Sequence, residues 1–198
     1  MSLNRTLCIL SLVLLSTPAP ALDQKKLDSL KAELNQNIPD STRSRLLFEV
    51  AEEVGASDTV LAFTYLNQGK EIAELQGDTR NLGKYHKILG KVLTQAGSYE
   101  KAILHYNRAL AYFNESDDEV SYFESIKEKG NVYLLQADFD QAMIHYQTAL
   151  NFYKKNNLTV GISRCLNNMG IIHKNRGDYD EALSVYQESL LFLDSVAH

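Results

Sequence analysis

Three stretches of similar design decide the fold. They read GKVLTQAGSYEKAILHYNRAL at residues 90–110, GNVYLLQADFDQAMIHYQTAL at residues 130–150 and GIIHKNRGDYDEALSVYQESL at residues 170–190. One constant shift aligns glycine at 90, 130 and 170, alanine at 102, 142 and 182, and tyrosine at 106, 146 and 186. Aromatic, aliphatic or small residues also align at 99, 103, 109 and 110 and their counterparts. So many columns at one shift indicate an internal repeat.

A more divergent copy precedes these three. It has Ala62, Phe63, Leu66 and Gly69 at the same phase, and Val50 where the other copies have glycine. We therefore predict a domain of about four repeats within residues 41–198.

Each copy is expected to form two helices joined by a short turn. Apolar residues recur at three and four residues, which is the period of a helix that is buried on one face. An Asp or Ser in the middle of a copy can cap the second helix. The interruptions are Ala56-Ser57-Asp58, Gly97-Ser98, Ala137-Asp138 and Gly177-Asp178. The prediction is an all-α protein.

The recurring glycines predict close helix contacts, because glycine inside a helix costs about 1 kcal/mol relative to alanine. We expect each glycine to lie opposite the alanine at 102, 142 or 182, with the tyrosine filling the wider part of the seam. One hairpin cannot bury its apolar face alone. Hairpins stacked in chain order would complete the burial, which predicts a solenoid with a concave and a convex side.

These columns resemble the tetratricopeptide repeat, which has a small residue in its first helix and then alanine, an aromatic residue and alanine in its second. The resemblance covers about residues 43–196 and implies antiparallel helix hairpins stacked as a right-handed superhelix, an α-solenoid. Two features depart from the family pattern. The period is 40 rather than about 34 residues, and Asn114 and Lys154 replace the family's proline. We interpret both as a longer second helix followed by a link.

Forty-residue versions of this repeat, with an early segment like residues 40–73, also resemble the exported sensor regions of bacterial signalling proteins such as histidine kinases. Residues 1–21 fit export, because Arg5 precedes an apolar run and Ala19-Pro20-Ala21 resembles a cleavage site. The run, from Leu7 to Leu15, is too short to span a bilayer, which needs about 20 apolar residues. We predict a signal peptide at 1–21 and a periplasmic or secreted mature protein.

Residues 22–40 are expected to form a capping helix, with Leu27, Leu30 and Leu34 at helical spacing. Removal of Arg5 with the signal peptide leaves 19 basic residues against 25 acidic ones, a formal charge of −6 that disfavours nucleic acid as a partner. Cys165 would then be the one remaining cysteine, so an internal disulfide cannot form. Packing must therefore stabilise the domain.

The last predicted helix carries Leu190, Leu191 and Leu193, and no polar capping helix follows it. Solenoids usually cover such a face. We expect either that the chain is a fragment or that this face binds a second copy or a downstream domain.

Catalytic motifs are absent from the sequence, which has no Gly-rich phosphate loop, nucleophile elbow or metalloprotease helix. We therefore predict a protein that is not an enzyme and holds no metal or cofactor. His105 and His145 occupy equivalent positions, but helices packed about 8 to 10 Å apart keep such residues from sharing a metal ion. We expect these histidines in a seam or on the surface, and Cys165 in the core.

The resemblance implies a concave face lined by the second, fifth, ninth and twelfth residues of each first helix. Six of these twelve residues are basic and Glu124 is the acidic one. The candidate binding residues are Lys84, Lys87, Lys91, Lys127, Asn131, Arg164, Asn167, Asn168 and Lys174. Positive charge there would favour an acidic partner or the free C-terminal carboxylate of a peptide. The alternative is that these lysines only form a solvated helix face.

Two functions fit these patterns. The first is an exported module that binds proteins or extended peptides along its concave face; Lys127, Asn131 and Asn168 match part of the carboxylate clamp of tetratricopeptide adaptors that hold chaperone tails. The second is a periplasmic sensory ectodomain of a histidine kinase or transcriptional regulator, truncated before its membrane and output segments. An apolar stretch of about 20 residues beyond residue 198 would support the sensor. Either protein could self-associate through its last helix.

Overall fold

The structure, a computed structural model, describes residues 23–55 and 57–194. Within these residues the chain forms nine α-helices and no strand, which confirms the predicted all-α class. The helices are α1 (Gln24–Leu34), α2 (Asp40–Val54), α3 (Thr59–Gln76), α4 (Thr79–Gln95), α5 (Tyr99–Glu115), α6 (Glu119–Leu135), α7 (Phe139–Lys155), α8 (Thr159–Arg176) and α9 (Tyr179–Asp194). The predicted signal peptide at 1–21 lies outside the described residues.

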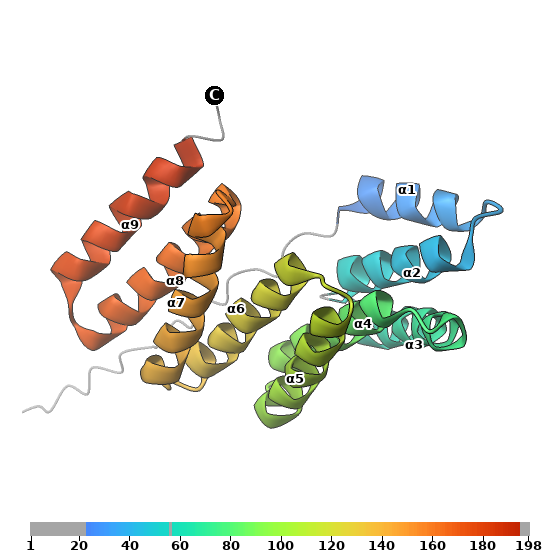
Figure 1. The fold of residues 1–198 in the computed structure, drawn as a ribbon, viewed down its shortest axis with the longest axis horizontal. Coiled ribbons are helices and arrows are strands. Elements are labelled where there is room, and N and C mark those ends of the chain that lie inside the picture. The colour runs from blue at the N-terminus through green and yellow to red at the C-terminus, as the bar shows by residue number, and fades with distance from the viewer. Residues whose placement is uncertain (1–22, 56, 195–198) are drawn as a thin grey trace, which may run out of the picture.

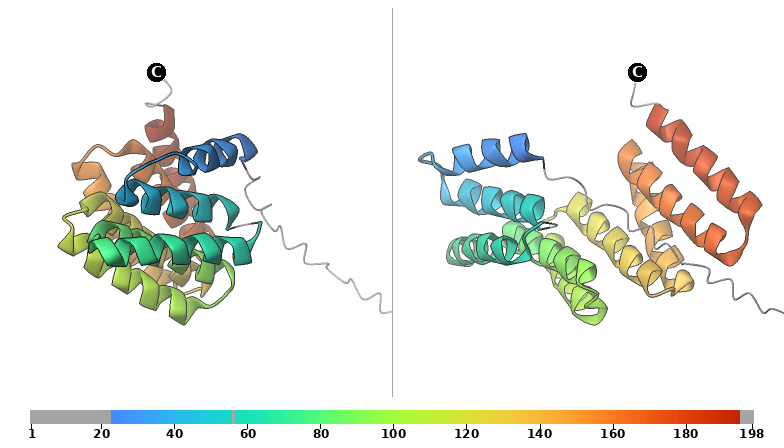
Figure 2. Two further views of the ribbon diagram at one scale, coloured as in Figure 1. Left: turned by 90° about the vertical axis from the view of Figure 1, so that its right-hand side faces the viewer. Right: turned by 180° about the vertical axis from the view of Figure 1, so that it is seen from behind.

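The helices pack as hairpins in chain order (Figure 1). α2 pairs with α3, α4 with α5, α6 with α7 and α8 with α9; we number these hairpins 1 to 4. The first helices α2, α4, α6 and α8 also contact one another in sequence, whereas the second helices make no such contact within the described ranges. The hairpins therefore form the predicted α-solenoid, with the first helices along its inner side (Figure 2).

Turns of one kind join the helices from α3 onward. A residue with a φ between 51° and 90° recurs at each turn, namely at Gly77, Gly97, Asp117, Ala137, Asn157 and Gly177. At three of these turns the next residue is an aspartate whose side chain accepts a hydrogen bond from the backbone N–H three residues further on. A left-handed residue ends one helix and the aspartate starts the next one.

This regular turn explains how the chain accommodates its long repeat. The second helices α5 and α7 have 17 residues each, and so do the first helices α4 and α6. The link after α5 consists of residues 116–118, since α5 continues to Glu115 and α6 begins at Glu119. The two helices of hairpins 2 and 3 are therefore equally long, because both are bounded by the same turn.

The recurring glycines make room for tyrosine rings. A Cβ added at Gly130 would lie 2.7 Å from Cε1 of Tyr146. Gly90 and Tyr106 form the same contact in hairpin 2, and Gly170 and Tyr186 form it in hairpin 4. This corrects the expectation that each glycine faces an alanine. The ring of the second helix lies directly on the glycine, where any side chain would occupy the same space.

Hairpin 1 solves the same packing problem in reverse. Its glycine, Gly69, is on the second helix, and an added Cβ there would lie 2.6 Å from the ring of Phe48 on the first helix. Val50 and Leu66, both fully buried, occupy the positions of the glycine and tyrosine of the other hairpins.

Helix α1 packs on hairpin 1. Its Leu27 and Leu30 join a buried cluster with Leu46, Val50 and Val54 of α2. Across residues 23–55 and 57–194, none of the helices is both long enough and apolar enough to cross a membrane.

Candidate functional site

Three neighbouring cavities lie along the inner side of α4, α6 and α8. Their volumes are about 240, 300 and 760 Å³. Lys127 of α6 and Arg164 of α8 line all three of them. We call these cavities together the inner groove, and its centre is this pair of cations.

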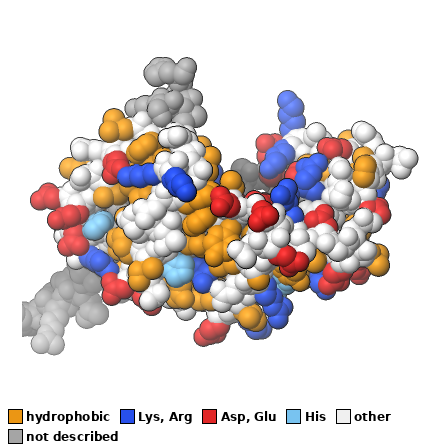
Figure 3. All heavy atoms as spheres, in the orientation of Figure 1, with side chains coloured by type: hydrophobic (Ala, Val, Ile, Leu, Met, Phe, Trp, Pro, Cys, Tyr) orange, Lys and Arg blue, Asp and Glu red, His pale blue; other side chains and the backbone are white. Residues whose placement is uncertain are grey.

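Ion pairs connect successive first helices along the groove. Glu52 of α2 pairs with Lys91 of α4 at 2.8 Å, and Lys87 of α4 pairs with Glu124 of α6 at 2.7 Å. Two of the predicted cations are therefore already paired with carboxylates. Elsewhere on the surface, acidic and basic side chains are also interspersed on the face shown in Figure 3.

The charge pattern changes between α6 and α8. The repeat shift places Lys127 at the position of Lys87, and Arg164 at the position of Glu124. A lysine and an arginine thus stand where the preceding helices have a lysine and a glutamate. Lys127 is buried and pairs with Glu128 of its own helix at 2.9 Å. Arg164 is exposed and forms no ion pair with any residue that the structure describes.

An asparagine network lies beside these cations. Oδ1 of Asn131 accepts hydrogen bonds from the Tyr146 hydroxyl at 2.7 Å and from Nδ2 of Asn168 at 2.9 Å. Nδ2 of Asn131 donates to Glu128 at 2.7 Å. These bonds fix Asn131 and Asn168, whereas Asn167 is exposed at the groove. Because an amide both donates and accepts hydrogen bonds, exposed asparagines suit a peptide backbone.

The structure brings together seven of the nine residues that the sequence suggested for binding. The groove is lined by Lys87, Lys91, Lys127, Asn131, Arg164, Asn167 and Asn168. Neither Lys84 nor Lys174 lines one of the three cavities. Burial, assisted by the nearby charge of Arg45, holds the pKa of Lys84 below its usual value.

Sequence reasoning missed the acidic and apolar parts of the groove. Glu52 and Glu128 stand one position away from those that the family pattern uses. Burial alone would raise the pKa of Glu52, but the charge and hydrogen bond of Lys91 outweigh it and lower that pKa. Val160 and Leu190 add apolar walls that are 46% and 58% exposed. The charge alternation between helices was visible in the sequence as Lys and Glu about one repeat apart.

His86 and His105 lie in the seam between α4 and α5, and Cys165 is buried in the core. Nδ1 of His86 on α4 is 2.9 Å from Nδ1 of His105 on α5, while His145 contacts the Gln141 carbonyl. His105 and His145 thus have different surroundings. Burial raises the pKa of the Cys165 thiol to about 12, which disfavours the reactive thiolate. In the part of the chain that the structure describes, no three His, Cys, Asp or Glu side chains are placed to hold a metal ion.

The sequence matches the tetratricopeptide repeat family over residues 84–155 and 122–191. The two matches together run from 84 to 191, which is more than half of the 198 residues. The chain therefore belongs to this family, as its columns predicted. No curated protein matches the chain by sequence.

Solved structures share the fold at low sequence identity. Aspartyl phosphate phosphatase F from Bacillus subtilis is 15% identical with a TM-score of 0.74, and covers 87% of this chain and 46% of its own. A Rap protein in complex with competence and sporulation factor is 20% identical with a TM-score of 0.75, over 84% of this chain and 48% of its own. BtubC from P. vanneervenii is 17% identical with a TM-score of 0.66, over 87% of this chain and 74% of its own.

These likenesses concern the fold. The chain spans about half the length of the phosphatase and of the Rap protein. Family and fold together define a tetratricopeptide scaffold, a class of proteins that bind other proteins or peptides.

Proposed function

We propose that this scaffold binds an extended peptide or protein segment in the inner groove, and that it recognises an acidic side chain or a free C-terminal carboxylate there. One observation carries this proposal. At the position where the preceding first helix has Glu124, α8 has Arg164, which lines all three cavities without an ion pair among the described residues. A guanidinium presents a planar fork of donors that matches a carboxylate.

The surroundings of Arg164 support a peptide rather than a small anion. Asn167 is exposed on the same helix at the groove, and its amide can bond a peptide backbone. Val160 and Leu190 line the same cavity and provide apolar contact for a neighbouring side chain of the ligand. The largest cavity, of about 760 Å³, has room for several residues of an extended chain.

The test is a charge reversal that preserves the scaffold. Arg164→Glu would recreate the pairing of Lys87 with Glu124, so we expect an unchanged or higher melting temperature. We expect affinity for acidic peptides to fall by about tenfold or more, roughly 1.4 kcal/mol. Peptide arrays with free and amidated C-termini would supply the ligands, and titration calorimetry would measure the affinities.

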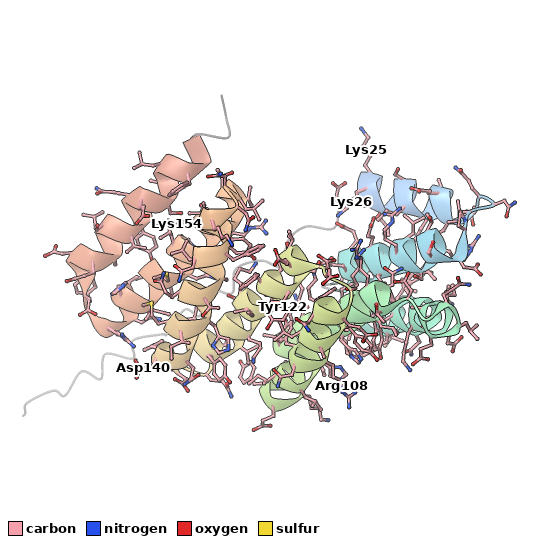
Figure 4. All side chains as sticks on the ribbon, viewed as in Figure 1. Lys25, Lys26, Arg108, Tyr122, Asp140 and Lys154 are labelled. Atoms are coloured by element: carbon pink, nitrogen blue, oxygen red, sulfur yellow. The ribbon has the colours of Figure 1, made fainter. Side chains whose placement is uncertain are left out.

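The matched control is Arg108→Glu, because Arg108 is an exposed arginine on the second helix α5 (Figure 4). This variant should bind the same peptides as the natural protein does. If Arg164→Glu retains full affinity, or if both reversals weaken binding equally, the groove is not the binding site.

We also propose that the mature protein is exported, because residues 1–21 have the pattern of a signal peptide. Mass spectrometry of protein purified from its own cells should find an N-terminus at Leu22; an intact Met1 would contradict export. As a second candidate we propose a sensory ectodomain, which the forty-residue period and the export pattern together support. A gene that encodes about 20 apolar residues and an output domain beyond residue 198 would favour it, and a stop codon there would exclude it.

A further inference from the structure

Helix α9 carries an apolar stripe that the described helices leave partly uncovered, since Tyr186 packs on Gly170 of α8 but its neighbours in the stripe are exposed. We call Tyr179, Leu183, Tyr186 and Leu190 the α9 stripe; their counterparts one repeat earlier are Phe139, Met143, Tyr146 and Leu150 of α7. Leu150 is 3% exposed, whereas Leu190 is 58% exposed. Leu183 is 57% exposed and Tyr179 70%, whereas Met143 and Phe139 are partly buried against the core cluster. In Figure 1, α9 ends the row, with α8 on one side only.

The interface between α7 and α8 shows what such a stripe receives. α8 contributes Ile162, Leu166 and Met169 to the buried cluster that contains Tyr146 and Leu150. Equivalent positions on second helices have the same spacing and the same side-chain chemistry. The α9 stripe therefore has the geometry to accept an amphipathic helix that presents aliphatic residues at three- and four-residue intervals.

Charge defines the occupant further. Arg176, near the C-terminal end of α8, pairs with Asp140 at the start of α7, and Figure 4 shows Asp140 there. The counterpart of Asp140 on α9 is Asp180, which is exposed. Between residues 179 and 192, α9 has the exposed carboxylates of Asp180 and Glu181 and no lysine or arginine, and its third carboxylate, Glu188, pairs with Lys154 of α7. A helix with a basic C-terminal turn is complementary to this surface.

A second copy of the chain fits less well. Pairing of α9 with another α9 would place these carboxylates against one another. Head-to-tail stacking would place α1 on the α9 stripe, but the leucines Leu27 and Leu30 of α1 are already buried against α2. The outward side of α1 presents polar residues instead, and Figure 4 shows Lys25 pointing away from the helix pair.

We propose that α9 docks an amphipathic helix of a partner protein, with an aliphatic stripe and an arginine or lysine in its last turn opposite Asp180. The helix lies antiparallel to α9, as α8 lies against α7. This surface adjoins the inner groove, because Tyr186 and Leu190 line its largest cavity. Tyr179 and Leu183 line none of the groove cavities, so changes at these two residues test the stripe alone.

The probe is a synthetic peptide of residues 158–176 with Cys165→Ser, constrained as a helix and verified as helical by circular dichroism. Fluorescence anisotropy with the 198-residue chain should show saturable one-to-one binding. The double variant Tyr179→Gln and Leu183→Gln should weaken binding by about tenfold or more, because both side chains lose apolar burial. The control, Leu104→Gln with Ile144→Gln, changes two similarly exposed aliphatic residues on α5 and α7 and should bind normally.

A charge exchange tests the orientation. Arg176→Glu in the peptide should weaken binding, and Asp180→Arg in the protein should restore it. The Tyr179 and Leu183 changes should leave binding of acidic peptides in the inner groove intact, because neither residue lines a groove cavity, which separates this proposal from the function of the groove. Absence of saturable binding, or equal losses in the control variant, would overturn the proposal. So would dimerisation of the chain that the Tyr179 and Leu183 changes abolish, because a second copy would then be the occupant.

Discussion

Hairpins 1 and 3 fill the same seam with opposite parts. In hairpin 3 the glycine is on the first helix and the ring of Tyr146 comes from the second. In hairpin 1 the ring of Phe48 comes from the first helix and Gly69 is on the second. Both rings are buried, at 0% and 1% exposure. The seam thus requires one large and one absent side chain, and either helix can supply each.

This comparison explains why the first repeat is divergent in sequence but regular in structure. Val50 and Leu66 of hairpin 1 are two side chains of medium size at the positions where hairpin 3 has Gly130, with no side chain, and Tyr146, with a large one. Core packing depends on total volume and shape, so a compensated exchange is tolerated where a single change is not.

The largest expected effect is from Gly130→Val. Its Cβ would lie 2.7 Å from the Tyr146 ring, and we expect a loss of about 3 kcal/mol or more in the free energy of unfolding. Guanidinium denaturation followed by circular dichroism would measure it. Adding Tyr146→Leu copies the Val50 and Leu66 pair and should recover about half of the loss. If the double variant is as unstable as the single one, the combined volume of the two facing side chains does not determine the packing of this seam.

Gly69→Ala tests the reversed seam of hairpin 1. The new methyl group would meet the Phe48 ring at 2.6 Å, and we expect a loss of about 2 kcal/mol. Asn67→Ala, an exposed change on the same helix, should stay within about 0.5 kcal/mol of the natural protein. A neutral result for Gly69→Ala would show that the Phe48 ring has room to move.

Hairpin 2 differs from the others at His86, whose counterparts are Leu46, Ile126 and Leu166. Burial, with the charges of His105 and Arg108, lowers the pKa of His86 from 6.5 to about 4. The unfolded chain therefore takes up a proton that the folded chain resists. The contribution of His86 to the free energy of unfolding is fully present above pH 6.5. It falls by about 1 to 2 kcal/mol as the pH drops towards 4, because His86 is protonated in the unfolded chain and not in the folded one.

The check is denaturation at pH 7 and pH 4.5. His86→Leu copies hairpins 1 and 4 and should reduce the difference between the two pH values. If the variant keeps the full pH dependence, carboxylates rather than His86 are responsible for it.

The smallest expected effect is at the turn of hairpin 3. Ala137 has a φ of 59°, where hairpins 2 and 4 have Gly97 and Gly177. Alanine in this conformation costs about 1 kcal/mol, and the greater freedom of glycine in the unfolded chain offsets part of that cost. Ala137→Gly should gain about 0.5 kcal/mol, and Gly177→Ala should lose about 1 kcal/mol. Loss of stability in Ala137→Gly would contradict the equivalence of these turns.

The sequence predicted the fold class, the repeat and the family, because many columns share a single repeat shift. It did not predict which residue faces Gly130. That contact depends on how the two helices cross, which periodicity does not specify. The left-handed turns were not predicted in every repeat either, since the positive φ of Asp117 and Asn157 occurs in residues that do not mark a turn as glycine does.

The sequence predicted most of the residues that line the inner groove, but not the ion pairs that some of them form. Family positions identified Lys87, Lys91 and Glu124, but their ion pairs, Lys87 with Glu124 and Lys91 with Glu52, become visible only when helices two apart are brought together. The exchange of Glu124 for Arg164 could have been found in the sequence by comparing charges at the repeat shift.

The series of ion pairs along the inner helices has a mechanical consequence. Lys26 with Glu53 joins α1 to α2, Glu52 with Lys91 joins α2 to α4, and Lys87 with Glu124 joins α4 to α6. Between α6 and α8 the corresponding positions hold two cations, Lys127 and Arg164, and no carboxylate. An acidic ligand at Arg164 would supply that carboxylate. The bound peptide would then form the ion pair that joins α8 of hairpin 4 to α6 of hairpin 3.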